Sequence, residues 1–557
     1  MHPSLQATSP RAARPFRLVG TPVYPSTDVD FFEESLAAFV RAGNFDDALE
    51  LIAASWPPLA TLHGARLREA IASVPEVTWG TDAWILAAMG ASYRSLDSQS
   101  RSAALPWFRT TRALIAADRP AEHVVASILT HESVSLRSLG QFDDARELAL
   151  DAWRMLADDV APTASQRIRV QAQIALQLGL THLHGGELDD AATMLRIALG
   201  LSEKNLVLSE TVECLAGLAY LEYLSGRYAA AVEFAERARD VAVGTDLIES
   251  RFGVGALIAL TLIAVERCDA AAAMNFSLPI VRSSERSEWH PVAHFAEAEV
   301  AVIDGRYIEG LECVRRGLDS ARTWQGEPQA RVMCEIVRGE LLMHLGEFAA
   351  ALEALQAVAP SPDHATCPAR FIAGIRYKAG DSAACLAALA ECERLGETHS
   401  ARTIVDVLFL KAAASYDLAQ PAQADVSFDR SLLLAAATGV RRPFLLVSSV
   451  ALQRMLCRAA DRGQPQRVHN LLADLKANDD IPLTGSLEPL SDREVDIAQQ
   501  LFEDKTVNQI ASDLYISSNT VKTHVRSIYR KLSANNRRDA VRRVRELGLD
   551  PNITPTD

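Results

Sequence analysis

The sequence lacks several features that define common classes of protein. No Gly-Lys pair occurs in its 557 residues, so the phosphate-binding loop Gly-x-x-x-x-Gly-Lys-Ser/Thr is absent and nucleotide-driven switching has no visible machinery. The longest largely apolar run, Phe252 to Val265, has 14 residues, whereas a membrane-spanning helix needs about 20. The first 30 residues contain five prolines and no apolar segment typical of a signal peptide. We therefore expect a cytoplasmic protein with no membrane partner.

Signatures of catalysis and of metal binding are also scarce. The eight cysteines never form Cys-x-x-Cys and mostly sit in apolar helical stretches, which indicates reduced, buried thiols. His290 and His294 have helical spacing, but Pro291 follows the first and no His-Glu-x-x-His results. His182 and His184 are two residues apart, and we interpret them as surface histidines. No Ser/His/Asp or paired-carboxylate motif stands out. We predict no catalytic residue, no metal, no cofactor and no enzymatic activity.

Charge is distributed unevenly along this acidic chain. The net charge is −15, and 49% hydrophobic with 23% charged residues is a globular composition. Residues 490–548 instead carry 11 Lys or Arg against 8 Asp or Glu. Between Lys522 and Arg545 there are nine basic residues, and Asp539 is the single acidic residue. Such a patch favours a polyanionic partner for this segment, and the alternative is an ordinary solvated helix face.

A short motif recurs along most of the chain with a period of roughly 40 residues. The pattern Gly-x-aromatic-x-x-Ala begins at four glycines, and degenerate forms begin at three more: Gly43, Gly140, Gly226 and Gly346, then Gly186, Gly305 and Gly380. A copy without glycine falls near Arg267, and weaker copies occur at residues 96–104 and 420–428. Glycine tolerates the left-handed conformation that ends a helix, and Asp or Glu favours the first turn of the next. Each repeat is therefore predicted to be an antiparallel helix pair.

The repeats predict an all-α fold. Apolar residues after each motif have helical spacing, and no segment shows a convincing alternating strand pattern. The motifs resemble tetratricopeptide repeats, although the spacing exceeds their standard of about 34 residues and the first-helix Trp-Leu-Gly signature is mostly missing. The expected fold is a TPR-like solenoid of helical hairpins. The resemblance implies a surface that binds proteins or peptides.

A different pattern begins near Leu490. Residues 478–489 contain two prolines and a glycine and are interpreted as a linker. Capping residues then predict four helices, and their expected caps are Ser491 with Glu494, Thr506, Ser517 or Ser518, and Asn536. Together these indicate a small second domain at residues 490–550.

The third of these helices is amphipathic. Its apolar face, expected to dock on the preceding helices, contains Val521, Val525, Ile528 and Leu532. Its opposite face is polar and basic and contains Asn519, Lys522, Thr523, Arg526 and Arg530. These side chains can donate hydrogen bonds to bases and phosphates in a major groove about 12 Å wide. Two short helices, a tight turn and this exposed face predict a helix-turn-helix domain.

The same segment resembles the LuxR/FixJ-type DNA-binding domain. Its Leu-Ser-x-Arg-Glu opening, Ile-Ala-x-x-Leu second helix and Ile-Ser-x-Asn-Thr-Val-Lys-x-His-Val run occur in order and at the family's spacing. The resemblance implies that Lys522, Thr523 and Arg526 read bases. It implies dimerisation on DNA through the fourth helix, with Val541 and Val544 near the seam. It also implies phosphate contacts at Ser518, Asn519 and Thr520, and more weakly at Thr506 and Arg530.

The chain departs from this family at three points. Asp504 stands where glycine is usual, and Ser518 replaces a frequent proline. Large regulators of the MalT-like group normally begin with an ATP-binding module, whose phosphate loop is missing here. The resemblance is therefore to the back half of such a regulator.

We expect five parts in order along the chain. They are an extended or disordered tail at 1–27, the array at 28–477, the linker at 478–489, the HTH domain at 490–550 and a short tail at 551–557. We expect a bacterial transcriptional regulator that binds double-stranded DNA as a homodimer. Its array is expected to sense a partner protein, peptide or small effector. The alternative is a protein-interaction scaffold with a vestigial HTH domain.

Overall fold

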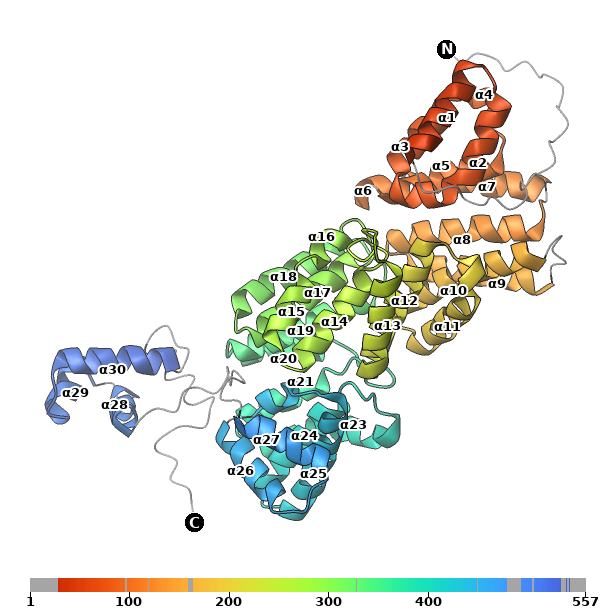
Figure 1. The fold of residues 1–557 in the computed structure, drawn as a ribbon. Helices are drawn as coiled ribbons and strands as arrows, with labels where there is room; N and C mark the ends of the chain where they lie inside the picture. Colours follow the sequence, from red (N-terminus) through yellow and green to blue (C-terminus); the bar gives the residue numbers. More distant parts are fainter. Residues whose placement is uncertain are drawn as a thin grey trace. The chain divides into compact units, whose positions relative to one another are not determined.

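In the computed structural model, the described residues are 29–95, 98–118, 120–158, 164–326, 328–447, 449–477, 492–502 and 505–531, with Arg537 and Ala540. Every regular element in these ranges is a helix, so the predicted all-α fold class is confirmed (Figure 1). None of these helices is both long and apolar enough to span a membrane. The predicted tails, 1–27 and 551–557, and the linker 478–489 lie outside the described residues.

The chain divides into two compact units. The first comprises Met1–Cys214, Glu285–Glu288 and Thr323–Pro328. Its elements are α1 (Val29–Arg41), α2 (Phe45–Leu62), α3 (Gly64–Ala72), α4 (Glu76–Trp79), α5 (Ala83–Ala91), η1 (Ser92–Ser95), α6 (Ser98–Arg101), α7 (Ala104–Asp118), α8 (Glu122–Ser138), α9 (Phe142–Asp158), α10 (Ala164–Gly185), α11 (Leu188–Asn205) and the start of α12 (Leu208–Leu224).

The second unit comprises Leu215–Ser284, Trp289–Arg322 and Gln329–Asp557. After the rest of α12, the elements of its array are α13 (Tyr228–Val241), α14 (Val254–Glu266), α15 (Ala270–Ser277), α16 (Ile280–Ser284), α17 (His290–Ile303), α18 (Tyr307–Ser320), α19 (Gln329–His344), α20 (Phe348–Gln356), α21 (Ala369–Lys378), α22 (Ser382–Ala388), α23 (Ala390–Leu395), η2 (Gly396–Thr398), α24 (Ile404–Asp417), α25 (Pro421–Thr438), η3 (Arg442–Leu445), α26 (Ser449–Ala460) and α27 (Gln466–Ala477). The elements of its C-terminal domain are α28 (Asp492–Phe502), α29 (Val507–Asp513) and α30 (Ser518–Lys531).

Within each unit, successive helices pack as hairpins, and the repeated glycines form their corners. In the first unit α8 packs against α9 and α10 against α11; in the second, α17 packs against α18 and α24 against α25. All seven motif glycines have positive φ, between 69° and 93°. At Gly140 the corner closes through the N–H of Gln141, which donates to the carbonyl of Leu136 at 3.0 Å. This bond satisfies a helix-end carbonyl, as a Schellman motif does.

Two corners adopt the same geometry without glycine. Cys268, in the predicted glycine-free copy, has φ of 56°, and Ala419, beside the weak copy at 420–428, has φ of 55°. Asp269 and Gln420 donate their N–H groups at 2.9 Å across these corners, as Gln141 does. The repeat therefore continues where its glycine signature fails. The weak copy at 96–104 differs, because α6 is a four-residue helix and residues 96–97 lie outside the described ranges.

Each unit has an apolar core with charged groups inside it. Trp56, Trp79 and Phe108 lie in the core of the first unit, and Phe409 packs edge-to-face on Phe444 in the second, with ring centroids 5.1 Å apart. Six of the eight cysteines are buried and none of them is disulfide-bonded, as predicted.

Several of the buried charges form ion pairs. In the first unit Arg137, fully buried, donates to Glu288 at 2.8 Å. In the second, the buried Arg442 lies 2.5 Å from both Glu299 and Glu340. A lone buried charge costs several kcal/mol, so these partners depend on one another.

The interpretation of His182 and His184 as surface histidines was wrong. The two side chains are only 5% and 4% exposed. The ring of His184 stacks on Phe142, with centroids 6.5 Å apart. A single helix in a layered array has neighbours on more than one side, so residues two apart can both be covered.

Candidate nucleic-acid interface

The helices α28, α29 and α30 enclose a small apolar core. Its fully covered members come from all three helices and from the segment beyond them: Ile497, Ala498, Leu501, Ile510, Ala511, Val521, Ile528 and Ala540. Val525 and Leu514 are partly buried against it. The predicted apolar face of α30 is thus confirmed at Val521, Val525 and Ile528. Leu532 lies outside the described residues.

A tight corner connects α29 to α30. Tyr515 has φ of 55° and is 95% exposed. Ile516 donates its N–H to the carbonyl of Ala511 at 3.0 Å, and its side chain packs on the core. This is the left-handed corner of the array repeats, built here without glycine. It redirects the chain between the end of α29 at Asp513 and the start of α30 at Ser518.

Two hydroxyl side chains begin these helices. Thr506 and Gln509 form a full capping box: the N–H of Thr506 donates to Oε1 of Gln509 at 2.8 Å, and Oγ1 of Thr506 accepts from the N–H of Gln509. Ser517 caps α30, because its Oγ accepts from the N–H of Thr520 at 3.0 Å. The structure therefore selects Ser517 from the two predicted caps. Ser518 instead donates to Oδ1 of Asn508 on α29 at 2.9 Å. Ser491 and Asp504 lie outside the described residues.

The three predicted base-reading residues lie on the exposed side of α30. Lys522, Thr523 and Arg526 are all exposed, on the face opposite the buried Val521 and Ile528. Within the described ranges, neither Lys522 nor Arg526 has an ion-pair or hydrogen-bond partner from the protein. The hydroxyl of Thr523 donates to the carbonyl of Asn519 at 3.0 Å, and its oxygen can still accept. Two cationic donors and one acceptor are thus presented without internal competition.

The start of α30 provides a second kind of contact. Asn519 and Thr520 are exposed and Ser518 is partly exposed. The cap at Ser517 occupies the N–H of Thr520, whereas no described group accepts from the N–H groups of Ser518 and Asn519. Free N–H groups at a helix N-terminus attract anions such as phosphate. The residues predicted to read bases and those predicted to bind phosphate therefore lie on the same helix, one turn apart.

The remaining predicted contacts are only partly covered by the structure. Thr506 is exposed, with its hydroxyl engaged in the capping box. Arg530 belongs to α30, but its side chain is outside the described set. Of the predicted fourth helix, the structure describes Arg537, which donates to the carbonyl of Leu501, and the buried Ala540. Val541 and Val544 lie outside the described residues.

An apolar core of three short helices, a tight corner and an exposed basic third helix define a helix-turn-helix DNA-binding domain. Residues 488–544 match the family model described as bacterial regulatory proteins, luxR family. The C-terminal part of the chain is therefore a LuxR-family helix-turn-helix domain, and DNA binding in transcription regulation is the role that this domain carries.

One solved structure also aligns over most of the chain. It is titled "Structure of Naa15/Naa10 bound to HypK-THB", and the alignment covers 95% of this chain and 94% of that chain at 9% identity. The TM-score is 0.22, which is too low to indicate a shared arrangement.

Sequence reasoning missed one group of side chains elsewhere in the second unit. His364, Cys367, Cys392 and His399 lie together and are all buried. Their spacing, His-x-x-Cys followed by Cys and then His seven residues later, was a usable signal. Neither Cys-x-x-Cys nor His-Glu-x-x-His matches this spacing, and the four residues meet only because the fold brings together the loop before α21, helix α23 and the residues after η2.

Proposed function

We propose that this protein is a sequence-specific transcriptional regulator in which Lys522, Thr523 and Arg526 read base edges. The observation that carries the proposal is the exposed face of α30, where Lys522 and Arg526 have no protein partner among the described residues. Lys and Arg are the usual donors to guanine in the major groove.

Phosphate contacts would set the position of α30 in the groove. We assign them to the start of the helix, at Ser518, Asn519 and Thr520, with Thr506 and Arg530 as outer contacts. Such contacts fix register and orientation without reading sequence. Dimerisation on DNA through the segment containing Val541 and Val544 would place two copies of α30 on successive half-sites.

The array would control this domain. This proposed control is supported by the repeated hairpin architecture of the acidic region and by its connection to a basic DNA-binding domain. Helix-pair arrays commonly bind proteins or peptides along one surface. An effector bound there, whether a protein, a peptide or a small molecule, would alter DNA affinity or dimerisation.

Capture of genomic DNA tests the DNA-reading part of the proposal. The full-length protein, its Lys522→Ala/Arg526→Ala variant and a Lys505→Ala control are each incubated with sheared host DNA at about 0.15 M salt, because phosphate contacts depend on salt. The control residue is basic and in the same domain, but it is paired with Asp513 at 3.0 Å. Discrete sites retained by wild type and control and lost by the double variant are the expected result.

Equal capture of DNA by all three proteins would contradict base reading by α30. It would instead favour the alternative, a protein-interaction scaffold with a vestigial HTH domain. The coupling is tested separately by deleting residues 1–480. Unaltered site affinity, dimerisation and promoter output in that deletion would refute control by the array.

A further inference from the structure

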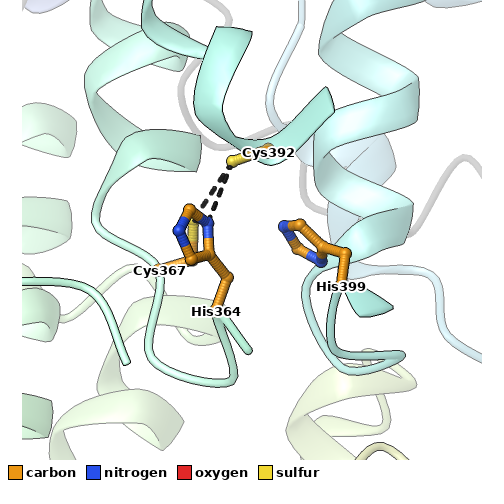
Figure 2. Close-up of side chains that lie close together, drawn as sticks. All are labelled: His364, Cys367, Cys392 and His399. Carbon is orange, nitrogen blue, oxygen red and sulfur yellow. Dashed lines mark hydrogen bonds between the residues drawn. The ribbon is translucent and has the colours of Figure 1, made fainter. Parts of the chain in front are cut away.

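Four buried side chains from three neighbouring segments meet in the second unit. His364 and Cys367 lie between α20 and α21, Cys392 lies in α23, and His399 follows η2. Their exposed fractions are 7%, 1%, 0% and 6%. One nitrogen or sulfur atom from each lies within 4.8 Å of the other three. Figure 2 shows the four side chains close together, with dashed lines that join Cys392 to His364 and to Cys367.

The distances between these atoms fit tetrahedral coordination. Sγ of Cys367 lies 3.6 Å from Sγ of Cys392, and Nδ1 of His364 lies 3.5 Å and 3.3 Å from the two sulfurs. Zinc bonds of about 2.3 Å to sulfur and about 2.05 Å to nitrogen give tetrahedral edges of about 3.8 Å for S···S and about 3.6 Å for S···N. Each observed distance agrees with its edge to within about 0.3 Å. One ion would therefore reach these three atoms after only small adjustments.

The fourth side chain is oriented as a ligand. Nδ1 of His399 lies 3.1 Å from the carbonyl oxygen of Ser400. Its other ring nitrogen, Nε2, is buried and has no hydrogen-bond partner among the described residues. A metal-bound histidine characteristically donates its second N–H to a carbonyl or carboxylate, which fixes the tautomer and leaves the first nitrogen free to coordinate. An unpartnered imidazole nitrogen in this position otherwise loses hydrogen-bonding free energy on burial.

Hydrogen bonds that use none of the proposed ligand atoms join the loop carrying His364 and Cys367 to the segment after His399. The N–H of Ser400 donates to the carbonyl of Asp363 at 2.7 Å, and the hydroxyl of Thr403 donates to the carbonyl of His364 at 2.7 Å. Arg402 donates to the carbonyl of Ala365 at 2.7 Å. These bonds join the two loops beside the cluster. Three of the four ligands, His364, Cys367 and His399, are thus brought together before any ion binds, which lowers the ordering entropy that binding would cost.

Hydrogen bonds from Cys392 and His364 lower the pKa of the Cys367 thiol well below its ordinary value, against the effect of burial. Thiolate is the form of cysteine that coordinates metal. The lowered pKa of Cys367 therefore favours the chemical form that the positions of the four side chains would require for coordination.

We propose that His364, Cys367, Cys392 and His399 bind one Zn²⁺ ion. Two sulfur and two nitrogen donors in tetrahedral array suit zinc and not the oxygen-preferring Mg²⁺ or Ca²⁺. All four positions are supplied by the protein, so the site is structural and has no place for a catalytic water. On binding, each thiol that coordinates the ion releases its proton to solvent.

The ion would fasten the loop carrying Arg402. This side chain is buried and reaches the hydroxyl of Tyr223 at 3.2 Å as well as the carbonyl of Ala365. The zinc site therefore stabilises the part of the second unit where α12 meets the segment before α24. Loss of the ion would therefore lower stability first where α12 meets the segment before α24.

Metal analysis of the full-length protein tests this site. Wild type, Cys367→Ser, His399→Ala and a Cys385→Ser control are purified under reducing conditions, incubated with Zn²⁺, desalted and analysed for metal. Cys385 is a buried thiol in α22 outside the cluster, so its variant controls for loss of a core cysteine. We expect one zinc per chain in wild type and control. Each ligand variant should bind Zn²⁺ more weakly by more than about 100-fold, the upper end of what loss of an outer-shell partner costs.

Cobalt substitution of the wild type keeps the test independent of how the variants fold. Co²⁺ should give the intense visible absorption of a tetrahedral cobalt thiolate, and Zn²⁺ should displace it. Wild type that retains no zinc, octahedral cobalt spectra, or a Cys367–Cys392 disulfide in the reduced preparation would each overturn the proposal.

Discussion

Replacing Gly226 by alanine should destabilise the array far more than replacing Gly380, although the two glycines occupy the same place in the repeat. Both belong to the second unit and both have left-handed backbones, with φ of 74° and 78°. An alanine in the left-handed conformation destabilises the folded state by about 1–2 kcal/mol. The lower conformational entropy of the unfolded chain offsets about 0.4–1 kcal/mol of that cost. The conformational effect is therefore nearly equal in the two variants.

The surroundings of the two glycines differ. A Cβ on Gly380 would meet nothing within 4 Å, whereas one on Gly226 would lie 2.4 Å from the backbone nitrogen of Arg402 and 2.7 Å from the carbonyl carbon of Ala401. Real Cβ contacts are almost never below 3.0 Å, so the backbone at Arg402 must move. Overpacking typically costs about 1–3 kcal/mol. A displaced Arg402 would also weaken its buried bonds to Tyr223 and Ala365, which adds about 1–3 kcal/mol.

We therefore expect Gly380→Ala to cost about 1 kcal/mol and Gly226→Ala at least about 2 kcal/mol more. Urea unfolding followed by circular dichroism gives the overall difference, and hydrogen exchange shows whether protection falls at α12, α13 and the start of α24. Equal losses in the two variants, or a milder effect at Gly226, would refute this account of the corner.

Three other side chains, Arg442, Glu210 and Thr506, give further predictions. Arg442→Met should cost about 3–5 kcal/mol, because it leaves two buried carboxylates without their cation; Arg441→Met, which removes a partly exposed ion pair, should cost less than about 1 kcal/mol in the same urea unfolding. Burial raises the pKa of Glu210 to about 7, above the usual 4.5 of the unfolded chain, so its contribution to stability should fall as pH rises from 4.5 toward 7, and thermal melts of Glu210→Gln should show a flatter profile over that range. Thr506→Ala should lower the stability of the C-terminal domain by about 1 kcal/mol, while Thr506→Ser keeps the cap; equal melting of the two would contradict the capping box.

Local chemistry explains which parts of the fold could be predicted from sequence. The glycine of the Gly-x-aromatic-x-x-Ala motif favours a left-handed corner directly, so the hairpins of the array were predictable. The corner at Cys268 was predictable only from the period of its neighbours, because a cysteine carries no such preference. The burial of His184 was not predictable, since it depends on Phe142 and on helices distant in sequence.

The face of α30 and the His364 cluster also differ in how far they could be predicted from the sequence. The α30 face was predictable because one helix carries all of it and helical spacing fixes which residues share a side. The cap was ambiguous between Ser517 and Ser518, and only the hydrogen bond to Thr520 decides it. In the His364 cluster, the spacing of His364 and Cys367 was a visible signal, but their approach to Cys392 and His399 depends on contacts between segments that only the fold brings together.

The central claim, that α30 reads base sequence, is tested most directly on a captured site with each base pair changed in turn. Binding of wild type, Lys522→Ala and Lys505→Ala is measured against every single-base change. The account predicts that Lys522→Ala weakens the best site by about 1–3 kcal/mol and becomes indifferent to one base pair, while the control keeps the wild-type preference everywhere. A Lys522→Ala variant that loses affinity equally for all sequences, with its selectivity intact at every position, would contradict it.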